Sequence, residues 1–184
     1  MPGMINDGMY SSTHGNWETP QKVFDTLNEI FDFTLDVCAT PETSKCGLFF
    51  STAENALEQS WEGYSCYMNP PYGKEIIQWV RKASQEQHKP NTTVVALLPN
   101  RTDTDWYQEY VTKARYLIII RHRLRFSNSK NSAPFPSVVA VFCQKSCSLC
   151  GKCQFPGWEV TRSLLGLWDL TPDRTEERRR NNKI

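Results

Sequence analysis

The 184-residue sequence lacks any apolar run long enough to cross a membrane, and its N-terminus lacks the pattern of a signal peptide. It also lacks internal repeats and a strong excess of one charge, since 21 lysines and arginines nearly balance 20 aspartates and glutamates. These absences predict a cytoplasmic protein without an overall electric field that would attract a polyanion. In that compartment the seven cysteines are expected to be reduced thiols or metal ligands.

The length of the chain fits one domain with a small appendage. Residues 1–15 are polar and rich in glycine and serine, which predicts a flexible lead-in. Apolar residues at helical spacing indicate helices in three segments: 20–31, 74–86 and 103–114. Continuous apolar runs indicate strands in six others: 33–38, 47–51, 65–68, 92–98, 116–120 and 137–142. Thr102 and Thr104 are alternative caps for the third helix.

This order of elements predicts an α/β fold, with a mainly parallel sheet and helices on both faces. The last two strands have no helix between them, so they are expected to form an antiparallel pair at the sheet edge. Ligands bind beyond the carboxyl ends of the strands in such sheets. Asp36, Asn69 and Pro99 each lie at the end of an expected strand, and one site can therefore contain all three.

The tetrapeptide Asn69-Pro70-Pro71-Tyr72 directly follows the apolar run Tyr64–Met68 and is the most informative motif in the chain. The asparagine side-chain oxygen and the carbonyl of the next residue can accept both hydrogens of one exocyclic NH2 group. These bonds limit delocalisation of the nitrogen lone pair and aim it at an electrophile. The prolines fix φ at about −65° and remove backbone hydrogen-bond donors. The tyrosine offers a flat face for stacking on a base. A proline turn with a packed tyrosine is the alternative interpretation; the strand before and the helix after favour the functional one.

Five segments of the chain together resemble one family of enzymes. They are Trp17-Glu18-Thr19-Pro20, Leu35-Asp36-Val37-Cys38-Ala39, Met68-Asn69-Pro70-Pro71-Tyr72-Gly73, the run Ala96-Leu97-Leu98-Pro99 through Arg101-Thr102-Asp103-Thr104, and Ala133-Pro134-Phe135-Pro136-Ser137. In this order they resemble the phage-type DNA N6-adenine methyltransferases over residues 16–142. Asn-Pro-Pro-Tyr alone is shared with protein-glutamine and some RNA amino-methyltransferases. The resemblance implies a class I S-adenosylmethionine-dependent methyltransferase fold with a Rossmann-like sheet, S-adenosylmethionine as the methyl donor, and double-stranded DNA as partner in the bacterial host of a phage or prophage.

The resemblance also implies roles for individual residues. Asn69, Pro70, Pro71 and Tyr72 would hold the target adenine, which must first be flipped out of the duplex. Adenine N6 is a poor nucleophile, so transfer by in-line displacement would depend on positioning and electrostatics, without a covalent intermediate or a separate strong base.

Five other residues would form the cofactor pocket. Thr19 and Pro20 match the element that begins this pocket, and Asp36 matches the acidic residue that closes the first strand, near the methionine end of the cofactor. Asn55 and Leu57 stand where related enzymes have an acidic or amide residue near the adenine ring of the cofactor. For Asp36, a carboxylate that stabilises the turn is the alternative.

One departure concerns the loop after the first strand. Cys38-Ala39-Thr40-Pro41 stands where most such enzymes have a glycine-rich loop that allows close backbone approach to the ligand.

Basic residues crowd one segment despite the balanced total charge. Arg121, Arg123, Arg125 and Lys130 are expected to contact DNA phosphates and bases, with a solvated surface loop as the alternative. Arg101 lies beside the expected pocket and would position the flipped nucleotide or form a local ion pair with Asp103.

The last region, over 143–184, is a cysteine-rich extension expected to pack back on the domain. Cys143, Cys147, Cys150 and Cys153 have the spacing C-x3-C-x2-C-x2-C. Four thiolates can hold a structural zinc ion or an iron–sulfur cluster, and reduced thiols without a ligand are the third possibility.

Two other functions compete with DNA adenine methylation. An amino-methyltransferase acting on RNA or protein glutamine would use the same tetrapeptide, although the later segments favour DNA. A nucleic-acid-binding module that has lost catalysis is the second rival, and the intact tetrapeptide argues against it. The sequence carries no signal for the recognition sequence, the oligomeric state or the biological role, whether that role is restriction-modification or regulation.

Overall fold

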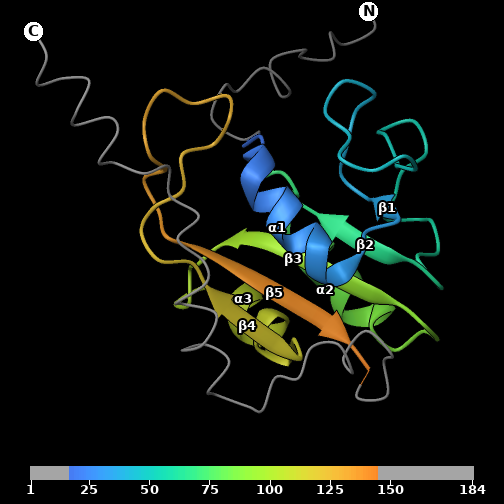
Figure 1. Ribbon diagram of the computed structural model, residues 1–184. Coiled ribbons are helices and arrows are strands. Elements are labelled where there is room, and N and C mark those ends of the chain that lie inside the picture. Colours follow the sequence, from blue (N-terminus) through green and yellow to red (C-terminus); the bar gives the residue numbers. More distant parts are fainter. Residues whose placement is uncertain (1–16, 145–184) are drawn as a thin grey trace, which may run out of the picture.

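The computed structural model describes residues 17–144, which form a mixed α/β fold around one sheet (Figure 1). The strands of this described part are β1 (Leu35–Asp36), β2 (Ser65–Met68), β3 (Thr93–Pro99), β4 (Tyr116–Ile119) and β5 (Ser137–Cys143). Its helices are α1 (Gln21–Phe31), α2 (Ile76–Glu86), α3 (Asp105–Glu109) and the 3-10 helix η2 (Val111–Lys113). The predicted lead-in and nearly all of the predicted extension lie outside the described residues.

The strands lie in the order β1-β2-β3-β5-β4 across the sheet. β1, β2 and β3 are parallel, whereas β5 pairs antiparallel with both β3 and β4. The prediction of an antiparallel pair at one edge of the sheet is thus confirmed. Because β5 runs against its neighbours, its first residue, Ser137, lies opposite Pro99 at the carboxyl end of β3. We call this side of the sheet, where β1 to β4 end and β5 begins, the carboxyl edge.

The core consists of two clusters, because successive strand side chains point to opposite faces of a sheet. One cluster joins the buried side of α1 to alternate strand residues that include Tyr67, Val95 and Leu97. The other joins the buried side of α2 to the intervening residues, including Cys66, Val94 and Ala96. Figure 1 shows α1 crossing in front of the sheet. Within residues 17–144 no helix has the length and apolar character needed to span a bilayer.

Three predicted elements are shorter in the structure. Only Leu35–Asp36 of the apolar run 33–38 forms a strand, and the run 47–51 makes just an isolated parallel bridge from Phe49 to Asp36. In the first run the apolar side chains are buried in the core without extending the ladder, whereas in the second Leu48 is exposed and the two phenylalanines are only half-buried. The third predicted helix divides into α3 and η2. Thr104 is its N-cap residue, but its hydroxyl donates to the Arg101 carbonyl at 2.8 Å instead of capping the helix.

The connection between β4 and β5, residues 120–136, positions the site. It leaves and re-enters the sheet at the carboxyl edge and lies beside the amino end of α1 (Figure 1). The Ser127 amide donates to the Glu18 carbonyl at 2.9 Å, and the Ala133 amide donates to the Leu124 carbonyl at 2.7 Å. These bonds fasten the connection both to itself and to the residues before α1.

Candidate active site

The predicted motif begins where β2 ends, at the carboxyl edge. Asn69 Nδ2 donates to the Trp17 backbone oxygen and to Thr19 Oγ1, the latter at 2.9 Å. Thr19 Oγ1 lies 2.6 Å from the Tyr67 hydroxyl, so the two share a hydrogen bond. The structure therefore brings Thr19, predicted for the cofactor pocket, into direct contact with Asn69, predicted for the target base.

The nitrogen of the Asn69 side chain makes two hydrogen bonds, whereas its oxygen makes none with the described residues. Asn69 Oδ1 is buried and has no hydrogen-bond partner among the described residues. An unpaired buried acceptor costs about 1–3 kcal/mol, and such groups are rare in folded proteins. This atom is consequently available to accept a hydrogen bond from the amino group of a ligand.

Two further polar atoms share this property and this location. Among residues 17–144 the buried side-chain atoms without a partner are Asn69 Oδ1, Asn100 Oδ1 and Ser137 Oγ. Asn100 directly follows β3, and Ser137 begins β5 opposite Pro99. All three atoms therefore come from the carboxyl edge, where ligands bind in α/β sheets. Sequence reasoning did not select Asn100 or Ser137, although both lie within or beside the segments that carry the resemblance.

Tyr72, the last residue of the motif, is held at both ends of its side chain. Its hydroxyl donates to the Leu97 carbonyl at 3.0 Å, and burial raises the pKa of this hydroxyl, which keeps it protonated. Its ring packs edge-on against Phe126 and Phe135, with centroids 6.1 and 5.5 Å away. Trp17 packs on the same two phenylalanines at 5.0 and 5.3 Å. We call these four rings the aromatic cluster.

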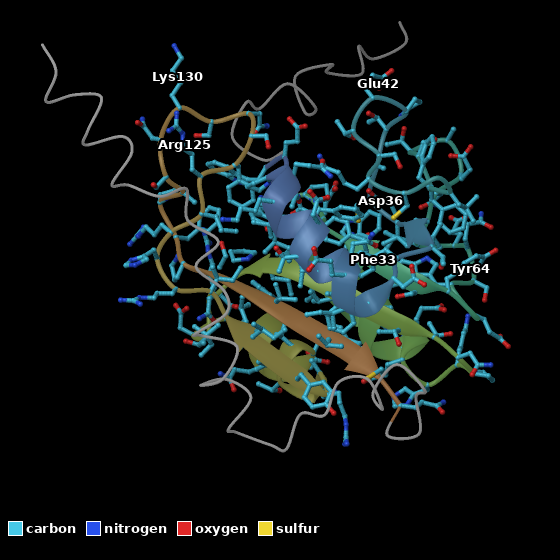
Figure 2. All side chains as sticks on the ribbon, in the orientation of Figure 1. Phe33, Asp36, Glu42, Tyr64, Arg125 and Lys130 are labelled. Carbon is cyan, nitrogen blue, oxygen red and sulfur yellow. The ribbon has the colours of Figure 1, made fainter. Side chains whose placement is uncertain are left out.

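Asp36 is buried at the end of β1, at the base of the loop that carries Glu42 (Figure 2). Its two carboxylate oxygens accept the backbone N–H groups of Cys38 and Lys45, each at 3.1 Å. Burial raises the pKa of Asp36, and these two hydrogen bonds oppose that increase. The carboxylate thus organises the loop that stands in place of the glycine-rich one, as the alternative interpretation expected.

Cys38 connects this loop to the motif. Its thiol accepts a hydrogen bond from the Asn69 backbone, and burial raises the pKa of the thiol, with a further increase from the charge of Asp36. The ends of β1 and β2 are therefore in contact, and Asp36 pairs with Tyr67, two residues before Asn69.

The other predicted cofactor residues lie in the turns before β2. Asn55 is on the surface with a left-handed φ of 47°, a conformation that asparagine tolerates better than most residues. Leu57 is half-buried two residues later. The turn geometry accounts for an asparagine at position 55, and the cofactor role of both residues stays a prediction.

The predicted DNA-contacting residues in the 120–136 connection are all exposed. Arg121, Arg123, Arg125 and Lys130 lie on its surface, and Figure 2 shows the last two toward its outer end. The connection is anchored below them by the buried side chains of Leu124 and Phe126. Ser127 Oγ also donates to the Thr19 carbonyl at 3.3 Å. The structure thus places the four cations on a segment that directly contacts the Asn69 network.

Arg101 is exposed just beyond the end of β3. The two ion pairs of the described part both involve Glu86, which contacts Lys82 at 2.8 Å and Lys89 at 2.9 Å. The ion pair considered for Arg101 and Asp103 is therefore not formed.

Of the four clustered cysteines, the structure describes Cys143 alone. This residue ends β5 and is buried in the core cluster on the α1 side. Cys147, Cys150 and Cys153 lie outside the described residues. Between residues 17 and 144 there is no group of three or more His, Cys, Asp or Glu side chains that could hold a metal ion. The zinc hypothesis stays a prediction.

Sequence reasoning also missed Tyr67. An aromatic residue in a buried strand gives no signal that distinguishes a packed ring from a hydrogen-bonded hydroxyl. The one available hint was that a buried tyrosine hydroxyl normally finds a polar partner.

Comparisons with known proteins confirm the family resemblance predicted from the sequence. The family model described as DNA N-6-adenine-methyltransferase (Dam) matches residues 9–144. The DNA N-6-adenine-methyltransferase of Haemophilus phage HP1 is 33% identical over 117 residues, covering 62% of this chain and 67% of the phage protein. The putative methyltransferase YfdM of Escherichia coli K12 is 30% identical over 63 residues, covering 30% of this chain and 69% of YfdM. The chain therefore belongs to the DNA N-6-adenine-methyltransferase (Dam) family.

Proposed function

We propose that this protein transfers a methyl group from S-adenosylmethionine to N6 of adenine at specific sites in double-stranded DNA, in the cytoplasm of a bacterial host. The observation that carries the proposal is the buried, unpartnered Asn69 Oδ1 at the carboxyl edge. Membership of the family supplies the chemistry, and this atom supplies the place where an amino group would bind.

The motif would act on the target amino group through two oxygens. Asn69 Oδ1 and the Pro70 carbonyl would each accept one N6 hydrogen, which directs the nitrogen lone pair away from the ring. As N6 forms its bond to the methyl carbon it becomes positive, and both oxygens stabilise that charge. The sulfonium of the cofactor would give up the methyl group and its sulfur would keep the electron pair of the broken bond, and N6 would afterwards release a proton to solvent.

S-adenosylmethionine supplies an electrophilic methyl group when it is bound. Thr19, Pro20, Asp36, Asn55 and Leu57 are the residues we propose to hold it. The loop after β1 supports this placement, because Asp36 fixes its backbone beside Asn69 through Cys38. We propose further that the sheet is of the class I methyltransferase type with helices on both faces, and the opposite-facing core clusters of α1 and α2 support this.

The target base must leave the duplex to reach Asn69. Tyr72 would provide the surface that replaces part of the lost stacking, and the aromatic cluster holds its ring in place. The exposed cations Arg121, Arg123, Arg125 and Lys130 would contact the DNA backbone, with Arg101 near the flipped nucleotide.

The test is transfer of labelled methyl from S-adenosylmethionine to unmethylated duplex DNA, followed by mass spectrometry of the nucleosides. N6-methyladenine is the expected product. Parallel reactions with RNA and with protein separate the first rival, since label there but not in DNA would identify an RNA or protein amino-methyltransferase. Duplex binding without transfer to any substrate would instead identify a binding module.

A further inference from the structure

We propose that Thr19 and Tyr67 act as an orienting pair, which holds the Asn69 amide with its oxygen toward the target base. The inference rests on the methyl transfer proposed above. Thr19 Oγ1 accepts from Asn69 Nδ2 at 2.9 Å and lies 2.6 Å from the hydroxyl of Tyr67, two residues before Asn69 in the chain. Both residues act through Asn69 and are positioning residues.

Orientation matters because an asparagine amide has two nearly equivalent arrangements. A half-turn of its terminal group exchanges the oxygen and the nitrogen with little change in shape. In the flipped arrangement the Asn69 NH2 group would face the adenine NH2 group, and two donors would oppose each other. Only the arrangement in which the oxygen points away from Trp17 and Thr19 can bind the target amino group.

Trp17 and Thr19 select this arrangement together. A backbone carbonyl can only accept a hydrogen bond, so the Asn69 atom that faces the Trp17 oxygen must be the nitrogen. A threonine hydroxyl can donate or accept, and alone it would tolerate either arrangement. Thr19 Oγ1 accepts from Asn69 Nδ2, and the hydrogen bond that it shares with the Tyr67 hydroxyl holds it in the position where it does so.

The surroundings keep this pair in place. Thr19 and Tyr67 are only 2% and 1% exposed, and hydrogen bonds are stronger in such a low-dielectric setting. The Thr19 backbone is held from the other side by the hydroxyl of Ser127, 3.3 Å from its carbonyl oxygen. Burial raises the pKa of Tyr67, so its hydroxyl stays protonated.

The test compares Thr19→Val and Tyr67→Phe, which remove one hydroxyl each, with Thr19→Ser, which keeps it. Thr92→Val is the matched control. Thr92 is also 2% exposed, and its hydroxyl makes two hydrogen bonds, to Pro90 at 3.0 Å and from Gly63 at 3.1 Å, before the amino end of β3. For each variant we would measure kcat and KM on duplex DNA, the Kd for S-adenosylmethionine, and the Tm.

Tyr67→Phe, which removes one hydrogen bond of the pair, is expected to lower kcat about tenfold, and Thr19→Val, which removes two, should lower it at least as much. In Tyr67→Phe the Kd for S-adenosylmethionine should change less than about twofold, because Tyr67 is not among the residues proposed to hold the cofactor. Thr19→Ser should restore most of the rate. The double variant should lose little more than Thr19→Val alone, since Thr19→Val already removes the bond to the Tyr67 hydroxyl.

Three results would overturn the orienting pair. A higher Kd for S-adenosylmethionine with kcat retained in Thr19→Val would place Thr19 in the cofactor pocket alone. An equal fall of kcat in Thr92→Val would show a general effect of lost stability. If wild type is active and Thr19→Val has the same kcat, Thr19 has no orienting role. A wild type that methylates no DNA would instead fail the proposed function, so the two failures are distinguishable.

Discussion

The side-chain nitrogen of Asn69 donates a hydrogen bond to the backbone oxygen of Trp17, 52 positions earlier in the chain. The ring of Trp17 packs on Phe126 and Phe135, the same rings that hold Tyr72. The segment before α1 therefore holds the first residue of the motif, and the 120–136 connection, on which Trp17 packs, holds the last. The geometry of the site depends on three distant parts of the sequence.

Ser137→Ala should make the protein more stable and less active. Its hydroxyl is fully buried without a partner among the described residues, so removing it relieves a cost of about 1 kcal/mol. If a ligand normally supplies the missing bond, KM for DNA or S-adenosylmethionine should rise by about fivefold. Chemical unfolding and steady-state kinetics measure the two effects, and a variant that gains stability with both KM values unchanged would exclude a ligand-binding role.

The stability of the protein should fall in strong alkali in a way that Tyr67→Phe removes. Burial raises the pKa of Tyr67 above its ordinary value of 10.0. Well below pH 10 the hydroxyl is protonated in both the folded and the unfolded state, so its contribution to the free energy of unfolding is constant. As the pH rises above 10 the hydroxyl ionises first in the unfolded state, and the free energy of unfolding falls until the pH passes the pKa of the folded state. The advantage of wild type over Tyr67→Phe should shrink by about 1.4 kcal/mol per pH unit in that range.

Urea unfolding of both proteins between about pH 8 and pH 11 tests this, because the comparison cancels the titration of shared groups. A difference in unfolding free energy that stays constant across the range would contradict the burial of this hydroxyl.

Alanine at Arg121, Arg123 and Arg125 should weaken DNA binding without slowing chemistry. Loss of each phosphate contact should reduce the slope of log Kd against log salt by about 0.9. KM for DNA should rise while kcat at saturating DNA is kept. Lys113→Ala is the matched control, since Lys113 is also exposed but precedes β4 at the opposite edge of the sheet. An equal effect of the control on the salt slope would mean that binding follows net charge and not this segment.

Metal analysis of the purified full-length protein tests the zinc prediction. Coordination by Cys143, Cys147, Cys150 and Cys153 predicts about one zinc per chain, lost in Cys150→Ser. Zinc-free protein in which all seven cysteines titrate as thiols after unfolding would favour unligated cysteines, and bound iron with visible absorption would favour the cluster alternative.

Several features could be predicted because they are local. The period of apolar residues located α1, α2 and β3 to within a few residues, and the absence of a helix between β4 and β5 correctly indicated their antiparallel pairing. The catalytic role of Asn69 could be predicted because four consecutive residues, Asn69-Pro70-Pro71-Tyr72, form the motif that indicates it. The order of the sheet then placed it at the edge where ligands bind.

Other features depend on contacts that no local pattern records. The apolar run 47–51 resembles a strand, but it pairs with β1 through a single bridge at Phe49. Thr19 reaches Asn69 only because Ser127 and the 120–136 connection hold the residues before α1 against the end of β2. The hydroxyl of Tyr67 gains its role from this tertiary contact, and a strand pattern shows only that its ring is buried.

The central claim is that Asn69 Oδ1 holds the target amino group, and Asn69→Ala tests it most directly. Wild type and variant would be incubated with labelled S-adenosylmethionine and unmethylated duplex DNA, with N6-methyladenine quantified by nucleoside mass spectrometry and cofactor affinity measured alongside. The account predicts N6-methyladenine from wild type and a loss of at least about 100-fold in the variant, with cofactor affinity nearly unchanged. Turnover near the wild-type rate in Asn69→Ala would contradict it and leave the motif with a structural role.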